Sequence, residues 1–175
     1  MKLQNGFTLI ELMMTIAIAA ILLSVAVPSF TGIIVNNRIS TQTNDLVSDL
    51  ALARSEAIKR GIRVTVAISS DGSTAKTSGS DWSVGRIVFA ESDSAGTSGT
   101  KDTNDDMLRV SSSLGNSNTL TAASFAKTYY VQYRPSGAID SAGTFTLCHS
   151  GYKGRVISIS ATGRVSTANT AAACT

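Results

Sequence analysis

The stretch that decides the fold is Phe7–Phe30, which reads FTLIELMMTIAIAAILLSVAVPSF and carries one charged side chain, Glu11. These 24 residues, at about 1.5 Å per residue in a helix, are long enough to cross a hydrocarbon core of roughly 30 Å. The leader before them, MKLQNG, carries Lys2, and a basic start keeps a leader in the cytoplasm while the remainder is exported. The sequence therefore predicts a short leader (residues 1–6) and a membrane-spanning helix (residues 7–30).

Glu11 is unusual because a carboxylate inside a lipid-facing helix costs about 2.5–3.5 kcal/mol on insertion scales. One interpretation is an interfacial acid that favours the positive end of the helix dipole. The preferred interpretation is that the chain is cut after Gly6, which gives Phe7 a free α-amine, and that Glu11 of a neighbouring copy neutralises this amine. The Gly6–Phe7 pair just upstream of the acid favours this second interpretation.

Residues 31–61 are expected to form an amphipathic helix that follows a kink at Pro28. Its mostly apolar stripe steps by three and four residues and consists of Ile39, Thr43, Leu46, Leu50, Ala53 and Ala57. The charged residues, Asp45 and Asp49 among them, are expected on the other faces. Gly61 is a natural helix terminator after the basic pair at 59–60.

The sequence predicts a β-rich head over residues 62–175. After Gly61 the apolar residues no longer recur with helical spacing but at every second position, as in a strand. The alternation at Ile62–Ile68 predicts a half-buried strand. Further strands are expected at Trp82–Ala90, Leu108–Ser111, Tyr129–Arg134, Thr144–Cys148, Arg155–Ser160 and Arg164–Ser166. The expected fold class is α+β, with a long N-terminal helix followed by an antiparallel sheet or β-sandwich-like head.

Composition excludes several classes of protein. Charged residues make up only 15% of the 175 and the net charge is +3, which argues against a coiled coil, a nucleic-acid-binding tail and a charge-rich disordered chain. One His and two Cys are too few for a multi-histidine metal site or a zinc module. No nucleophile–base pair, paired-carboxylate motif or phosphate loop suggests an enzyme, and no cofactor or metal is expected.

The segment Ser92–Asp106 is an acidic loop rich in Gly, Ser and Thr. Its end, Asp102–Asp106, opens like a calcium loop, but Met107 and Ser113 stand where an EF-hand requires Gly and Glu. A solvated acidic loop is the preferred interpretation, and an irregular calcium site is the alternative.

Cys148 and Cys174 are the only cysteines, and an even pair in an exported domain favours a disulfide over two free buried thiols.

The charges of the head are unevenly distributed. Residues 71–106 hold seven acids and three bases, whereas residues 127–175 hold five bases and one acid.

The segment Gly6-Phe7-Thr8-Leu9-Ile10-Glu11-Leu12 resembles the type III leader motif of type IV prepilins and of type II secretion pseudopilins. The resemblance implies that a prepilin peptidase cleaves after Gly6 and N-methylates Phe7, and that Glu11 guides insertion into the growing fibre. Pro28 stands where members of that family have a kinking proline.

The remainder of the chain is similar to the GspH/FimT/FimU branch of minor pilins and pseudopilins. The matching segments follow in order: NNRISTQTNDLVSDLALARSEAIKRG at 36–61, Trp82 with GRIVF at 85–89, LRV at 108–110, GTFTLC at 143–148 and TGRV at 162–165. The resemblance implies a β-sandwich-like head. The extra Cys pair of many relatives is absent, because those positions read Val66-Ala67-Ile68 and Thr74-Ala75-Lys76.

The expected function is that of a non-enzymatic structural subunit, a minor pilin present at low abundance near the tip of a type IV pilus. A GspH-like pseudopilin of a type II secretion system is one alternative. A DNA-binding competence pilin is another, although the Gly-Arg-x-Arg motif of such relatives here reads Gly163-Arg164-Val165-Ser166. Lys153 and Arg155 would then join Arg164 as phosphate contacts.

These expectations imply a location and a set of partners. The chain is expected in the inner membrane with its head in the periplasm, and afterwards in a pilus or pseudopilus. The expected partners are other pilins or pseudopilins, prepilin peptidase, inner-membrane lipid and, in the last alternative, DNA.

Overall fold

The computed structural model describes residues 6–92, 98–115 and 117–174, except for the side chains of residues 25–29. The leader residues 1–5 and part of the Ser92–Asp106 loop lie outside this description. The chain divides into two compact units, residues 1–37 and 38–175.

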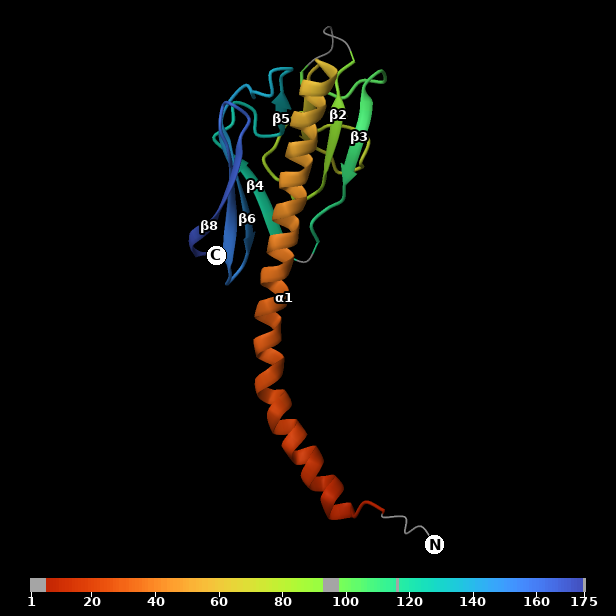
Figure 1. The fold of residues 1–175 in the computed structure, drawn as a ribbon, viewed down its shortest axis with the longest axis vertical. Helices are drawn as coiled ribbons and strands as arrows, with labels where there is room; N and C mark the ends of the chain where they lie inside the picture. The colour runs from red at the N-terminus through yellow and green to blue at the C-terminus, as the bar shows by residue number, and fades with distance from the viewer. Residues whose placement is uncertain (1–5, 93–97, 116, 175) are drawn as a thin grey trace. The chain divides into compact units, whose positions relative to one another are not determined.

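Helix α1, Leu9–Arg60, supplies the helical part of both units (Figure 1). Thr8 precedes it, and the Thr8 hydroxyl accepts a hydrogen bond from the Glu11 amide at 3.3 Å, which satisfies one of the free N–H groups of the first turn. The helix ends at Gly61, whose φ of 67° is a left-handed conformation that glycine adopts without strain. Pro28 lies within α1, among the residues whose side chains are not described, so the predicted kink stays a prediction.

The second unit, residues 38–175, contains the C-terminal part of α1 and two four-stranded antiparallel sheets. The first sheet has the order β3-β2-β1-β5 and the second the order β4-β6-β7-β8. The strands are β1 Val64–Ile68, β2 Arg86–Ala90, β3 Asp106–Ser111, β4 Asn118–Ala123, β5 Tyr130–Tyr133, β6 Gly143–His149, β7 Lys153–Ile159 and β8 Val165–Ala173. A long N-terminal helix followed by antiparallel sheets confirms the predicted α+β fold class.

The predicted stripe on α1 forms part of the core of this unit. Its six members are at most 4% exposed: Ile39, Thr43, Leu46, Leu50, Ala53 and Ala57. Trp82, Phe125 and Phe145 add an aromatic cluster, with ring centroids 4.7 Å apart for Trp82–Phe145 and 5.0 Å for Phe125–Phe145. Aromatic rings at these distances pack favourably as edge-on or tilted pairs.

The structure corrects the predicted strands in several places. β1 is buried on both faces rather than on one, because Ala67 packs in a cluster with Ile87 and Phe89 that Ala75 and Met107 cover. The strand predicted from Trp82 begins only at Arg86. β4 was not expected, and β8 continues to Ala173, seven residues past the predicted end at Ser166.

Candidate functional site

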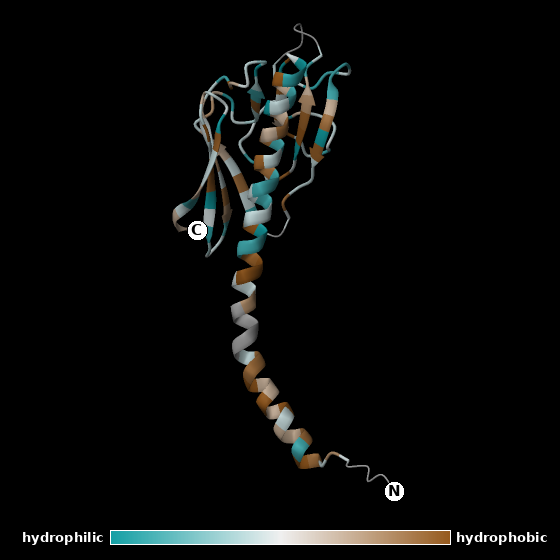
Figure 2. Cartoon of the chain, in the orientation of Figure 1, coloured by the Kyte–Doolittle hydropathy of each residue, from teal (hydrophilic) through white to brown (hydrophobic). Residues whose placement is uncertain are grey.

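The N-terminal part of α1 presents an apolar surface. Gly6 and Phe7 lie immediately before the helix, and Phe7 is 79% exposed. Figure 2 shows mainly apolar residues along this part of α1. The large apolar side chains that are more than half exposed are Leu9, Ile10, Leu12, Met13, Met14, Ile16, Ile18, Ile21, Leu22, Leu23, Phe30, Ile33 and Ile34. Exposed apolar surface on this scale marks a site of interaction with a membrane or with other subunits.

Glu11 lies in the first turn of α1 and is the only ionisable side chain between Phe7 and Ile34. Its amide hydrogen bond to Thr8 forms one half of a capping box, the arrangement in which a hydroxyl residue is followed three positions later by Glu. The carboxylate is exposed. The geometry therefore gives Glu11 a local role at the helix start and leaves its carboxylate accessible to a partner.

The expected membrane span Phe7–Phe30 includes residues 25–29, whose side chains lie outside the description. Over the residues that the structure does describe, no helix reaches the length and hydropathy that a membrane crossing requires.

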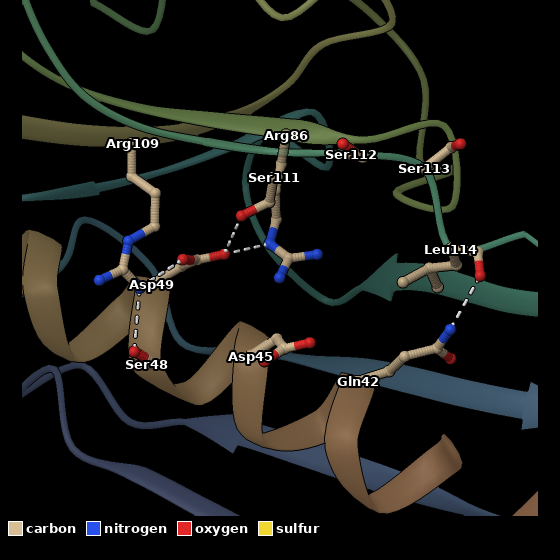
Figure 3. Close-up of a pocket in the computed structure, with 10 residues that line it drawn as sticks. All are labelled: Gln42, Asp45, Ser48, Asp49, Arg86, Arg109, Ser111, Ser112, Ser113 and Leu114. Carbon is tan, nitrogen blue, oxygen red and sulfur yellow. Dashed lines mark hydrogen bonds and ion pairs between the residues drawn. The ribbon is translucent and has the colours of Figure 1, made fainter.

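A polar pocket of about 370 Å³ lies between α1 and the first sheet of the head (Figure 3). Asp49 of α1 is 1% exposed and Arg86 of β2 is 2% exposed. The Asp49 Oδ2–Arg86 Nε distance is 2.6 Å, and Arg109 of β3 lies 3.0 Å from Oδ1. The Ser111 hydroxyl donates a third hydrogen bond to Asp49 at 2.9 Å. The two cations and the hydroxyl satisfy the charge and the hydrogen-bonding capacity of the buried Asp49 carboxylate. Asp49 thereby joins the helix to two strands.

The sequence did not predict this network, because its pattern places Asp49 on a face of the helix other than the apolar stripe. Two signals were present. Asp49 comes three residues after Leu46 and four before Ala53, so it adjoins the buried stripe. Arg86 opens the apolar run RIVFA. Both carboxylate oxygens of Asp49 are paired with arginines from neighbouring strands, and this geometry indicates a structural role in docking α1.

A second polar chain connects α1 to the other sheet. The Asn118 side-chain amide of β4 donates to Gln42 Oε1 at 2.6 Å, and Gln42 in turn donates to the Leu114 carbonyl at 2.9 Å. His149 of β6 contacts Asn118 through its ring nitrogen Nδ1. His149 therefore belongs to a side-chain network that links the helix to β4 and β6.

Cys148 and Cys174 form a disulfide, as predicted, with their Cα atoms 5.6 Å apart. The bond joins β6 to the residue that follows β8. Gly154 of β7 lies against it, and a Cβ there would stand 2.2 Å from the Leu147 carbonyl and 2.9 Å from the Cys174 sulfur. Only glycine fits at this position, because β7 approaches β6 closely here.

The three residues predicted as phosphate contacts do not form one cluster. Lys153 and Arg155 lie on β7, and Arg164 lies in the turn before β8. Arg155 pairs with Asn169, so Arg164 is separated from this end of the hairpin by five residues of β8, about 17 Å of extended chain. The three cations therefore do not lie together, and their role as phosphate contacts of DNA stays a prediction.

Two described acidic side chains of the Ser92–Asp106 loop, Asp105 and Asp106, have partners. Asp105 accepts hydrogen bonds from the Ser92 and Asp102 amides at 3.0 and 2.8 Å, and Asp106 lies 2.6 Å from Arg60. Within the described ranges, no group of three or more His, Cys, Asp or Glu residues is arranged to hold a metal ion.

Comparison with known proteins identifies two matching families. Residues 42–163 match the family described as type II transport protein GspH, and residues 1–27 match the prokaryotic N-terminal methylation motif. The search of curated protein sequences gave no match.

Two kinds of solved structure have a similar fold. The type IV minor pilin FimU of Pseudomonas aeruginosa is 21% identical, with a TM-score of 0.57, over 76% of this chain and 90% of that chain. The minor pseudopilin EpsH of the type 2 secretion system of Vibrio cholerae is 14% identical, with a TM-score of 0.52, over 75% of this chain and 97% of that chain. At these identities the likeness shows the pilin-like fold alone. Because the GspH match covers most of the chain and follows a methylation motif, the chain belongs to the GspH family of pilin-like proteins.

Proposed function

We propose that this chain is a minor pilin, a non-enzymatic subunit that enters a type IV pilus at low abundance near the tip and supports pilus assembly. The observation that carries the proposal is the apolar surface formed by the described side chains of α1 between Leu9 and Ile34, which contains one acid and overlaps the methylation motif of residues 1–27. A surface of this kind must be covered by lipid or by the helices of other subunits.

The proposed sequence of events starts in the inner membrane, where the helix spans the bilayer once and the head lies in the periplasm. Prepilin peptidase cleaves after Gly6 and methylates the amine of Phe7. The accessible Glu11 carboxylate then pairs with the amine of a neighbouring subunit, so that two charges in an apolar environment neutralise each other. The partners are other pilins, prepilin peptidase and membrane lipid.

A pseudopilin of a type II secretion system is the second candidate, and the match to the family described as type II transport protein GspH supports it. Both candidates use the same helix and the same processing. They differ in the filament that the subunit enters.

The test is deletion of the gene in a strain that cannot retract pili, followed by counting of surface pili in electron micrographs. Loss of pili that the wild-type gene restores is the result expected of a minor pilin. Normal pilus numbers together with loss of protein secretion would favour the pseudopilin instead. Normal pili with loss of DNA uptake would contradict both and point to a competence pilin.

A further inference from the structure

β8 is a long sheet edge without the usual protection. It is the terminal strand of its sheet, and its nine residues, VSTANTAAA, include no charged residue and no proline. Seven of the nine side chains are exposed and the other two are half-buried, so neither face of the strand is covered. An edge of this length and composition is a ready template for pairing with another strand.

The other three sheet edges in the described part of the head are protected. β3 carries Asp106 and Arg109. The outer side of β4 is bonded to the loop between β1 and β2, because the Trp82 amide donates to the Leu120 carbonyl and the Ala122 amide to the Ser80 carbonyl. β5 has only four residues and pairs at its end with Ile139. β8 is the exception.

The register shows which backbone groups of β8 face outward. Ser160 donates its amide hydrogen to the Arg164 carbonyl, so these two residues form a hydrogen-bonded pair that closes the β7–β8 hairpin. The pairs alternate along an antiparallel ladder, and the register continues through Ser158↔Ser166 and Val156↔Ala168. Val165, Thr167 and Asn169 therefore direct their N–H and C=O groups away from β7. Among the described residues, none accepts or donates a hydrogen bond to these outward groups.

Basic side chains lie near both ends of this neutral edge. Arg164 is exposed just before β8, and Lys153 of β7 is paired with Ala173 at the other end of β8, while Arg155 is paired with Asn169 at the middle of the strand. Within the described chain these three residues form no ion pair, whereas Arg134 is paired with Asp140 at 2.6 Å. Two copies of this chain joined through β8 would bring two sets of unpaired cations together, which disfavours self-pairing.

We propose that β8 is a docking edge for an extended segment of a different filament subunit, which adds to the sheet as a fifth strand. The segment is uncharged over about eight or nine residues, because it spans a neutral edge of about 25–30 Å. It carries acidic residues on either side of this neutral part, which meet Arg164 at one end and Lys153 at the other. The inference adds a contact of the head to the proposed function and rests on the chain being a filament subunit.

The experiment uses the full-length protein in its own cells, with a photo-activated cross-linking residue in place of Thr167 or, as a control, of the exposed Ser73 on a loop of the other sheet. The expected result is a Thr167 cross-link to an extended segment of another protein with an N-terminal methylation motif, identified by mass spectrometry. Hydrogen exchange on the captured complex should show the Thr167 and Asn169 amides slowed at least about tenfold relative to the isolated protein.

A pair of variants tests the main-chain contact. Thr167→Pro removes one outward N–H and leaves the bonds to β7 intact, because proline is tolerated where the N–H faces outward from an edge. Thr167→Ala keeps the N–H. In these variants the cross-linking residue replaces Ser166. Thr167→Pro should lower the cross-link yield about tenfold, the effect of losing one good contact, and Thr167→Ala should leave it nearly unchanged.

Folding of each variant is checked by the Cys148–Cys174 disulfide and by the fluorescence of Trp82. If Thr167→Pro does not fold, the pair Thr167→Lys and Thr167→Gln replaces it, since a lysine on an edge blocks strand addition. Equal yields from Thr167→Pro and Thr167→Ala would overturn the inference, as would a cross-link to DNA or to a second copy of this chain. Wild-type protein is also assayed in sheared filaments, and its absence there would reject the proposed function whatever the cross-link shows.

Discussion

At the scale of single residues, Tyr133 is notable because its hydroxyl is the one buried side-chain polar atom without a hydrogen bond among the described residues. The side chain is fully buried and lines a pocket between α1 and the turn at Gly163. Burial raises the pKa of Tyr133 to about 12, so the phenol stays neutral at all physiological pH values.

We expect Tyr133→Phe to leave the head as stable as the wild type or to stabilise it by up to about 1 kcal/mol. The reason is that a buried polar group without a partner carries a desolvation cost that the phenyl ring does not have. Thermal unfolding of the detergent-solubilised protein, followed by the fluorescence of Trp82, measures this change. A loss of about 1 kcal/mol or more, the usual cost of removing a bonded hydroxyl, would show that the hydroxyl has a partner in solution.

Asp71 contrasts with Tyr133, because its exposed carboxylate accepts hydrogen bonds from several donors. The Thr74 hydroxyl lies 2.6 Å from Oδ2, and the Thr74 and Ser73 amides and the Ser69 hydroxyl each lie 2.9 Å from Oδ1. The hydrogen bond from the Thr74 hydroxyl, followed by those from the two amides, holds the pKa of Asp71 well below its usual range.

The low pKa of Asp71 predicts a pH dependence of stability. Because the folded pKa lies below the unfolded value of about 3.9, the ionised form stabilises the turn fully above about pH 4, and this contribution is lost as the pH falls further. Asp71→Asn should therefore be less stable than the wild type at pH 7 and should lose less additional stability between pH 4 and pH 2. Parallel pH profiles of the two proteins would contradict this assignment.

At the scale of elements, the position of α1 on the head depends on polar contacts as well as on its apolar stripe. Asp49 contacts β2 and β3 through Arg86 and Arg109, while Gln42 contacts β4. Arg54 donates to the Gly137 and Thr162 carbonyls at 3.2 Å each. Directional contacts of this kind determine the rotation and register of the helix, which apolar packing determines less strictly.

Asp49→Asn should destabilise the head by about 3–5 kcal/mol, because removal of one partner leaves the Arg86 charge buried without compensation. Asp45→Asn is the matched control. Asp45 lines the same pocket but is exposed, so its replacement should change stability by less than about 0.5 kcal/mol. Denaturant unfolding with Trp82 as the probe measures both variants, and equal losses would show that burial of the ion pair is not the cause.

At the scale of the whole molecule, the chain combines a helix whose N-terminal part needs apolar partners with a head that has its own core. The head contains two sheets, an aromatic cluster and a disulfide. None of the described side chains in the apolar part of α1, from Leu9 to Ile34, belongs to that core. The two requirements are therefore separable, as the proposed function requires of a subunit that is stored in a membrane and later moved into a filament.

Glu11→Ala should leave the protein in the membrane but remove it from sheared filaments, since docking loses the charge that neutralises a neighbour's amine. Thr8→Ala is the control, because it removes the hydroxyl that accepts from the Glu11 amide and keeps the carboxylate. Immunoblots of membrane and filament fractions measure both. Normal incorporation of Glu11→Ala would refute the pairing, and equal losses in both variants would assign the effect to the helix start.

The sequence alone determined the features that depend on local order: the leader motif, the buried stripe from Ile39 to Ala57, the α+β class and a cysteine pair suited to a disulfide. Local patterns carry this information because helical periodicity and processing motifs are read over a few neighbouring residues.

Only the tertiary structure decided what lies together across long separations. It buried Asp49 against Arg86, 37 residues away, and it separated Arg164 from Lys153 and Arg155. It also made β8 a long edge, although the four alanines and the asparagine in its sequence weaken its strand preference. The physical reason is that burial of a charge and pairing of a strand depend on neighbours that the fold supplies, and no local pattern contains them.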